Sequence, residues 1–213
     1  MESTSGIRVS ICTQVLNQSA MLKKMIASVV AQTFPDWELL IVDDGSTEDI
    51  KAVIASFDDK RIRYWRFDEN KGIPHGLNFA MKVAIGEFIG MLAADEVIHH
   101  EKLEVQIAYM EAHPGVACVW GLPWQGPMGL RPEWEQYALG AHNRSRQAWL
   151  RTLLNLENVP IGAASFLMRR EVMKSLGYMD PELTMFSDHE LYCRFFSAGH
   201  VGKLLPYRWA IET

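Results

Sequence analysis

The chain has 213 residues, of which 48% are apolar, and a formal net charge of −5 at pH 7. A chain of this size can bury a full core without disulfides or structural metals, so we expect one domain over residues 1–213. The negative charge and the lack of a Lys/Arg-dense segment argue against a nucleic-acid partner, which would require a concentrated basic face. The partner is therefore expected to be a small molecule.

The cysteines and the N-terminus restrict the setting of the protein. Cys12, Cys118 and Cys193 lie far apart and form no Cys-x-x-Cys pair, which favours core thiols over zinc ligands or disulfides. The first six residues are short and polar, and no uncharged stretch reaches the roughly 18 residues that span a bilayer. We expect a cytoplasmic protein, and peripheral contact with a membrane through an acceptor or a further segment stays open.

Strand and helix patterns alternate along the chain. Short β-rich runs are expected as strands and segments with helical apolar spacing as helices, beginning with strand 9–13 and a helix that Ser19 caps. The pattern continues with strand 38–42, helix 47–57, strand 62–67, helix 74–84, strand 88–92, helix 101–112, strand 116–120, helix 145–154, strand 165–168 and a helix opening near Asp188. This alternation predicts an α/β fold with a mainly parallel sheet, helices on both faces and ligands at the carboxyl ends of the strands.

A long segment, 121–143, interrupts this alternation with several prolines, glycines and tryptophans. Loops of this length are uncommon in compact domains and often serve as lids or binding loops, while a disordered excursion is the alternative.

Two aspartates, Asp43 and Asp44, follow the second expected strand and precede Gly45 and Ser46. Asp-Gly-Ser is common turn chemistry, and a turn is the simpler interpretation. The functional alternative is a carboxylate that accepts a hydrogen bond from the imide N–H of a uracil or thymine ring.

A second acid pair, Asp95 and Glu96, follows the fourth expected strand. Solvated acids at a strand end are the simpler interpretation. Hard cations such as Mg²⁺ or Mn²⁺ take carboxylate oxygens together with substrate phosphates, so one or two acids beside a diphosphate would make an adequate metal site.

A third group, Asp188 and Glu190, follows Ser187 at an expected helix start. Carboxylates are favoured there by capping and by the helix dipole. The functional alternative is a general base that takes a proton from an attacking hydroxyl.

Other candidates are weaker. The run His99-His100-Glu101 lacks metal spacing on one helical face and indicates a solvated helix entry. Trp120 and Trp124 are more typical of packing than of sugar stacking, although aromatic faces suit sugar rings. No P-loop and no Gly-x-Gly-x-x-Gly motif is present, which argues against a P-loop protein and against a Rossmann dinucleotide-binding protein.

In their order along the chain, these segments resemble the inverting family 2 nucleotide-sugar glycosyltransferases, which have the GT-A fold. The similar segments run almost end to end: 9–11 leading to Asn17, 31–34, 37–47, 70–72, Asn78, 86–89, 95–96, 177–180 and 188–194. The ordered series is specific, although each piece alone is not.

The resemblance implies roles for individual residues. Asp43 or Asp44 would hold the base of a UDP-sugar, Asp95 with Glu96 would bind Mn²⁺ or Mg²⁺ and the donor diphosphate, and Asp188 would be the catalytic base. The sugar would pass with inversion to a hydroxyl of a glycan, glycolipid or other acceptor. The donor part would span about 7–120 and the acceptor part about 121–213. Further donor contacts would come from Thr13, Gln14, Asn17, Gly72, Asn78 and Ala94, and acceptor contacts from Trp120, Gly162 and Ser187.

Several positions depart from the family pattern. Gln14-Val15-Leu16-Asn17 lacks the proline and the stacking aromatic of the usual first loop, and Ala93 and Ala94 remove the first acid of the usual Asp-x-Asp-Asp. Ser187 stands where a glutamate usually precedes the base, and the sequence ends at Thr213, the length of a truncated or minimal catalytic domain.

These departures keep two alternatives open. One is a catalytically silent nucleotide- or partner-binding module with the GT-A fold, which the loss of the first acid and of the stacking ring favours. The other is a nucleotidyltransferase, which would require a first loop rich in Gly and Arg/Lys. Residues 13–20 contain none of these residue types.

Overall fold

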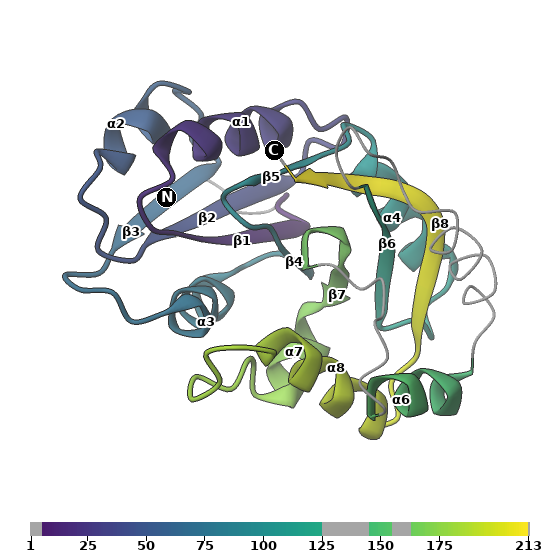
Figure 1. Cartoon of the computed structure of the whole chain (residues 1–213). Helices are drawn as coiled ribbons and strands as arrows, with labels where there is room; N and C mark the ends of the chain where they lie inside the picture. Colours follow the sequence, from purple (N-terminus) through teal and green to yellow (C-terminus); the bar gives the residue numbers. More distant parts are fainter. Residues whose placement is uncertain (1–5, 125–144, 155–162, 213) are drawn as a thin grey trace.

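The structure, a computed structural model, describes residues 6–124, 145–154 and 163–212 and has an eight-stranded sheet at its centre (Figure 1). The strand order is β3-β2-β1-β4-β7-β6-β8-β5. The strands are β1 (Val9–Val15), β2 (Trp37–Asp43), β3 (Ile62–Arg66), β4 (Phe88–Met91), β5 (Glu96–Ile98), β6 (Cys118–Trp124), β7 (Leu167–Arg169) and β8 (Gly202–Glu212). The helices are α1 (Ser19–Val30), α2 (Ile50–Ala55), α3 (Ile73–Val83), α4 (Lys102–Ala112), α6 (Arg146–Leu154), α7 (Arg170–Leu176) and α8 (Ser187–Ser197), with a 3-10 turn, η1, at Ala163–Ser165.

The sheet is parallel in its first half and mixed in its second. β1 pairs in parallel with β2 and β4, and β2 pairs in parallel with β3. β7 is antiparallel to both of its neighbours, β6 is parallel to β8, and β5 is antiparallel to β8. The predicted α/β fold with a mixed, mainly parallel sheet is confirmed. The first half therefore brings the carboxyl ends of three neighbouring strands, β2, β1 and β4, to one edge.

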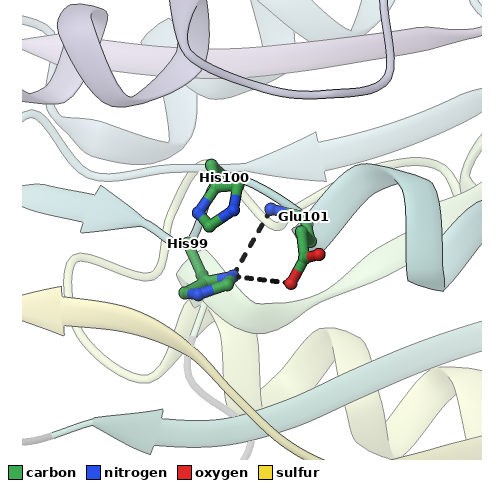
Figure 2. A group of neighbouring side chains, drawn as sticks. All are labelled: His99, His100 and Glu101. Carbon is green, nitrogen blue, oxygen red and sulfur yellow. Dashed lines mark hydrogen bonds and ion pairs between the residues drawn. The ribbon is translucent and has the colours of Figure 1, made fainter.

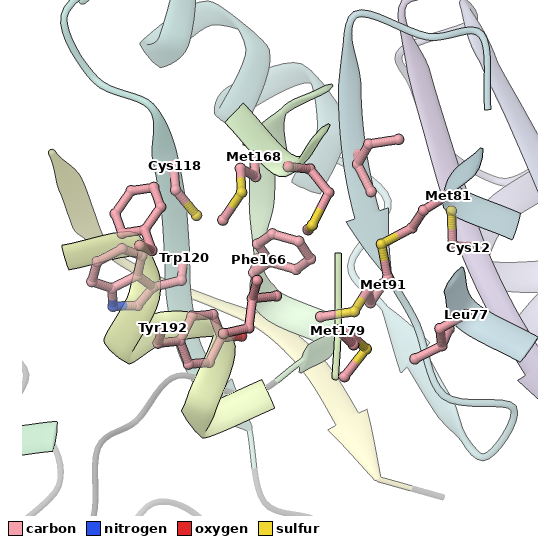
Figure 3. Close-up of a cluster of buried hydrophobic side chains, with 14 of the residues drawn as sticks. Cys12, Leu77, Met81, Met91, Cys118, Trp120, Phe166, Met168, Met179 and Tyr192 are labelled. Carbon is pink, nitrogen blue, oxygen red and sulfur yellow. The ribbon is translucent and has the colours of Figure 1, made fainter. Parts of the chain in front are cut away.

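Two apolar clusters cover the two faces of the sheet. Side chains alternate along β2, so that Leu39 and Ile41 join the cluster under α1, whereas Leu40 and Val42 join the cluster under α3. The two helices lie on opposite sides of β1 and β2 (Figure 1). All seven residues of β2 are buried, as expected for a strand covered on both faces. Figure 3 shows part of the α3-side cluster, with Met91 and Met179 between Leu77 and Phe166.

The structure corrects several expected elements. The helix expected over 47–57 is the shorter α2, because the Asp49 carboxylate caps it by accepting from Ala52 N at 3.0 Å. The strand expected over 165–168 becomes η1 followed by β7, and the expected strand over 116–120 begins later and extends to Trp124. Sequence reasoning missed α7, which ends at Leu176 and is capped by Gly177 with φ +79°, and the edge pair β5 and β8. β5 has only three residues, and its register with β8 is set by a segment far along the chain.

Most of the segment 121–143 lies outside the described residues. Among the described helices, none combines the length and the apolar character that a membrane crossing requires.

Candidate active site

A pocket of about 430 Å³ lies where β1 and β4 end. Its walls come from the loops after these strands, from the start of α3 and from the segment that leads into α8. Two of the three acid groups meet here, because Asp95 and Asp188 both line the pocket. Four other residues predicted to bind ligand or to neighbour the site line it as well: Gln14, Ala93, Ala94 and Ser187.

Asp188 is the acid of α8 that faces the pocket. Its carboxylate is partly buried and accepts a hydrogen bond from His189 N at 2.8 Å. Glu190, the other acid of the first turn, instead forms an ion pair with Arg194 one turn later, at 2.5 Å. Asp188 therefore faces the pocket, whereas Glu190 is held within the helix, and the role of Asp188 as a general base stays a prediction.

Asp95 provides a second carboxylate to the lining of the pocket. Glu96 does not line the pocket, and its carboxylate accepts from Ala93 N at 3.2 Å, which closes the loop on itself. Ala93 is exposed at the pocket and offers no oxygen ligand from its side chain.

The chemistry of this donor set fits a hard divalent cation held jointly by the protein and a ligand. Carboxylates that share a pocket repel each other unless a cation or donor offsets the charge. Mg²⁺ and Mn²⁺ are commonly held by one or two carboxylates plus phosphate oxygens. Asp95 is the residue that would hold such an ion, and Glu96 lies behind it in the loop.

Asp43 is fully buried and organises the loop after β2. Its carboxylate accepts from Ser46 N at 2.8 Å, from the Tyr64 hydroxyl at 2.9 Å and from Arg66 Nη1 at 2.8 Å. Arg66 also donates to Ser46 O at 2.7 Å. Burial and the bond to Asp43 raise the pKa of Tyr64. These contacts support the turn interpretation of Asp43, and recognition of a base by Asp43 stays a prediction.

Asp44 is also fully buried, and its contacts connect the loop after β2 with the loop before α3 and with β1. It accepts from Lys71 N at 2.8 Å, from Gly72 N at 2.9 Å and from Gln14 Nε2 at 3.1 Å. Gln14 in turn lines the pocket, so Asp44 positions a pocket side chain rather than lining the pocket itself.

Gly76 in α3 is a site residue that sequence reasoning missed. A Cβ at this position would lie 2.6 Å from Gln14 Cγ, so the glycine makes room for Gln14 across the helix. The signal was available, because a glycine inside a helical pattern commonly marks a close approach.

Of three further predicted donor residues, none lines the pocket; two of them hold segments together, and the third is buried in β1. Asn17 accepts from Thr47 N at 2.7 Å and so ties the loop after β1 to the loop after β2. The Asn78 amide makes two hydrogen bonds with the Met179 peptide, at 2.8 and 3.0 Å, which anchor the segment before α8 to α3. Thr13 is fully buried in β1, and its hydroxyl has no hydrogen-bond partner within the described ranges.

Of the three predicted acceptor contacts, the structure describes two, Trp120 and Ser187. Trp120 is 1% exposed and packs edge-on against Trp149 and Phe196, with ring centroids 5.2 and 6.0 Å away. The buried ring gives no support to an acceptor contact by Trp120, which stays a prediction. Gly162 lies outside the described residues. Ser187 does line the pocket.

The run His99-His100-Glu101 lies just before α4, and all three residues are exposed (Figure 2). The expectation of a solvated helix entry is confirmed. Their ligand atoms nevertheless lie within 4.8 Å of one another, because the run forms a turn to which helix-face spacing does not apply. The Glu101 N–H lies 3.4 Å from His99 Nδ1, and none of the three lines the pocket described above.

The fold and this pocket define an α/β protein with carboxylates at a ligand site formed by strand ends. The chain belongs to glycosyl transferase family 2, because the family model "Glycosyl transferase family 2" matches residues 10–177. A relative of known specificity is the Escherichia coli UDP-Glc:alpha-D-GlcNAc-diphosphoundecaprenol beta-1,3-glucosyltransferase WfgD, which is 36% identical over 102 residues, or 48% of this chain and 40% of that protein. The matched stretch, about half of this chain, thus covers less than half of the length of WfgD and less than a fifth of that of three Rickettsia glycosyltransferases.

Solved structures share the fold. Staphylococcus aureus TarS 1-349 in complex with UDP is similar with a TM-score of 0.80 at 18% identity, over 96% of this chain and 60% of that one. The mannosyltransferase PcManGT from Pyrobaculum calidifontis, in complex with GDP-Man and Mn²⁺, is similar with a TM-score of 0.77 at 18% identity, over 99% of this chain and 58% of that one. The predicted GT-A fold is confirmed.

Proposed function

We propose that the chain is an inverting, metal-dependent glycosyltransferase that moves a sugar from a nucleoside-diphosphate sugar to an acceptor hydroxyl. The observation that carries the proposal is the meeting of Asp95 and Asp188 in one pocket at the carboxyl ends of parallel strands. A transferase of this kind needs two such carboxylates in separate roles, one beside the leaving diphosphate and one beside the attacking hydroxyl.

A UDP-sugar is the proposed donor. TarS has been solved with UDP, and the name of WfgD gives UDP-Glc as its donor, while PcManGT binds GDP-Man together with Mn²⁺. The bonds that tie Asn17 and Asp44 to neighbouring loops give this chain a preformed rim for a nucleotide beside the pocket.

The acceptor is proposed to be a glycan or glycolipid in the synthesis of a polysaccharide or glycoconjugate. The name of WfgD gives a GlcNAc diphospholipid as its acceptor, which supports a sugar ring at the acceptor end. We propose a cytoplasmic protein whose contact with a membrane, where it occurs, is made through such an acceptor.

The reaction follows from the two carboxylates. Asp188 takes the proton of the acceptor hydroxyl, and the oxygen attacks the anomeric carbon from the side opposite to the nucleoside diphosphate. The bond from that carbon to the diphosphate breaks as the new glycosidic bond forms, so one displacement inverts the anomeric centre. Asp95 would hold Mn²⁺ or Mg²⁺ together with the diphosphate, and the ion would offset the charge of the leaving group.

One observation favours the second candidate, a catalytically silent binding module. Ala93 occupies the exposed pocket position at which the family usually has an acid, so the pocket has one carboxylate fewer. Such a module would bind a nucleotide or a partner without turnover.

A thermal-shift titration with UDP, dTDP, GDP and CMP tests the proposal, each nucleotide with Mn²⁺, with Mg²⁺ and with chelator. A ligand at about 100 times its Kd stabilises the folded state by about 2.7 kcal/mol. We expect a metal-dependent shift with UDP that Asp188→Asn retains and Asp95→Ala weakens. Turnover of UDP-sugars would then separate the two candidates, since the silent module would bind UDP without hydrolysis or transfer. No shift with any of the four nucleotides would contradict the transferase.

A further inference from the structure

The rim of the pocket is unusually apolar and exposed. Ile73, Met185 and Phe186 all line the pocket, with exposed fractions of 55%, 67% and 70%. Phe186 is the most exposed large hydrophobic side chain among the residues whose burial the structure describes. Apolar surface left in water is unfavourable, so a cluster of this kind beside a pocket indicates a ligand surface.

The backbone presents Phe186 at this place. Its φ of 59° and ψ of 20° lie in the left-handed region, which non-glycine residues rarely adopt and which concentrates at functional sites. The residue is fixed there because α8 begins at the next position and the Phe186 carbonyl accepts from Glu190 N at 2.9 Å. The buried Ser187 follows directly, so the chain turns inward immediately after the exposed ring.

Phe186 lies two residues before Asp188, and both line the same pocket. A hydroxyl that gives its proton to Asp188 must come within about 3 Å of the carboxylate. The part of the acceptor that carries this hydroxyl is therefore within reach of the neighbouring rim side chains. The donor diphosphate, by contrast, is proposed to lie beside Asp95, which also lines the pocket.

We propose that Phe186, flanked by Met185 and Ile73, is a platform on which the acceptor's sugar ring stacks, so that the attacking hydroxyl belongs to a glycosyl residue. This inference rests on the proposed function. A sugar ring offers an apolar C–H face to the aromatic ring and hydroxyls to Asp188 and Ser187. A hydrocarbon chain at the same place would cover the carboxylates without hydrogen-bonding to them, which is costly for charged groups.

Octyl β-D-glucoside below its critical micelle concentration tests the platform, because this probe carries both a sugar ring and a hydrocarbon chain. Saturation-transfer difference NMR shows which part contacts the protein, measured with and without UDP and Mn²⁺. We expect ring protons of one face to receive the strongest saturation in the wild type and in Phe186→Tyr. Phe186→Leu, which keeps apolar surface but loses the flat ring, is expected to lower that signal at least threefold.

A matched control and a kinetic readout complete the test. Ile85→Ala removes another exposed apolar side chain, 41% exposed and outside the pocket lining, and should leave the NMR pattern unchanged. With a panel of methyl glycosides as acceptors, Phe186→Leu should raise the acceptor KM about tenfold while the donor KM stays within twofold. The thermal shift with UDP verifies that each variant folds and binds donor.

The possible failures are distinguishable. Strongest saturation of the octyl protons, or ring saturation that Phe186→Leu leaves unchanged, would overturn the platform while a UDP shift still supported the transferase. No shift with any of the four nucleotides, together with ring saturation that depends on Phe186, would instead overturn the proposed function and keep the sugar platform.

Discussion

The acids at the end of β2 and the acids that line the pocket have opposite environments. Asp43 and Asp44 are fully buried, and each accepts three hydrogen bonds, most of them from segments distant in sequence. Asp95 and Asp188 are partly exposed and line the pocket. The first pair thus builds the loops, and the second pair lies at the surface of the pocket.

The difference teaches that an acid at a strand end is not by itself a ligand-binding group. A buried carboxylate must be satisfied by donors, since an unpaired buried charge is very costly, and those donors then define a rigid loop. A carboxylate at a pocket keeps part of its solvation and can exchange it for a cation or a substrate proton. Exposure and partners, which depend on distant segments, separate the two roles.

Removing the charge of the pocket acid on α8 should have the largest effect. We expect Asp188→Asn to lower kcat by about 10²- to 10⁴-fold, the range of general base catalysis, while UDP binding stays nearly unchanged. Single-turnover assays with UDP-sugars measure the loss. Glu190→Gln is the matched control, because this neighbouring acid pairs with Arg194 and should retain most of the activity. Full turnover by Asp188→Asn would remove the assignment of the base.

Truncating the loop-building acid should affect stability instead. Asp43→Ala leaves Ser46 N, the Tyr64 hydroxyl and Arg66 without their shared acceptor, and we expect a loss of about 1–3 kcal/mol in the free energy of unfolding. Urea unfolding measures it, with the exposed Asp68→Ala as a control expected within about 0.5 kcal/mol of wild type. Equal losses in the free energy of unfolding for Asp43→Ala and for the pocket variant Asp95→Ala would contradict the distinction between loop-building and pocket acids.

Lys102 is a buried basic residue, and burial disfavours its charged form. It is 3% exposed, and burial lowers its pKa to about 7, below the roughly 10.4 of an unfolded lysine. Between these values the unfolded chain carries a proton that the folded chain has lost. The free energy of unfolding should therefore rise with pH from about 7 to 10, by up to about 1.4 kcal/mol per pH unit from this group.

Lys102→Met should remove this slope and stabilise the protein most below pH 7, where the wild type carries the buried charge. Urea unfolding at several pH values measures the difference, and the exposed Lys24→Met serves as the control. A pH-independent difference between wild type and Lys102→Met would contradict the shifted pKa.

The smallest effect is expected at Gln14, which donates to the buried Asp44 and also lines the pocket. Gly76→Ala would place a Cβ 2.6 Å from Gln14 Cγ, so Gln14 must move and lose its hydrogen bond to Asp44. We expect UDP affinity to fall severalfold, corresponding to about 1 kcal/mol, as measured by isothermal titration calorimetry. Ala80→Gly in the same helix is the control for helix propensity. Unchanged UDP affinity in Gly76→Ala would show that Gln14 does not contribute to donor binding.

Local patterns in the sequence determined the alternation of strands and helices, the mainly parallel sheet and the position of the acids after strands. These features depend on residue spacing over a few positions, as in the continuous apolar run of β2, and the chain needs no distant segment to display them. The ordered motifs also sufficed for the family, which the match over residues 10–177 confirms.

Only the tertiary structure decided which acids face the pocket and which are buried and hydrogen-bonded within the fold. Asp43 meets Arg66 across β2 and β3, Asn78 meets Met179 between α3 and the segment before α8, and Trp120 is enclosed by α6 and α8. The pairing of β5 with β8 and the exposed ring of Phe186 likewise follow from contacts between distant segments. Burial and hydrogen-bond partners are properties of the packed chain, so residues with the same local sequence pattern acquire different chemistry.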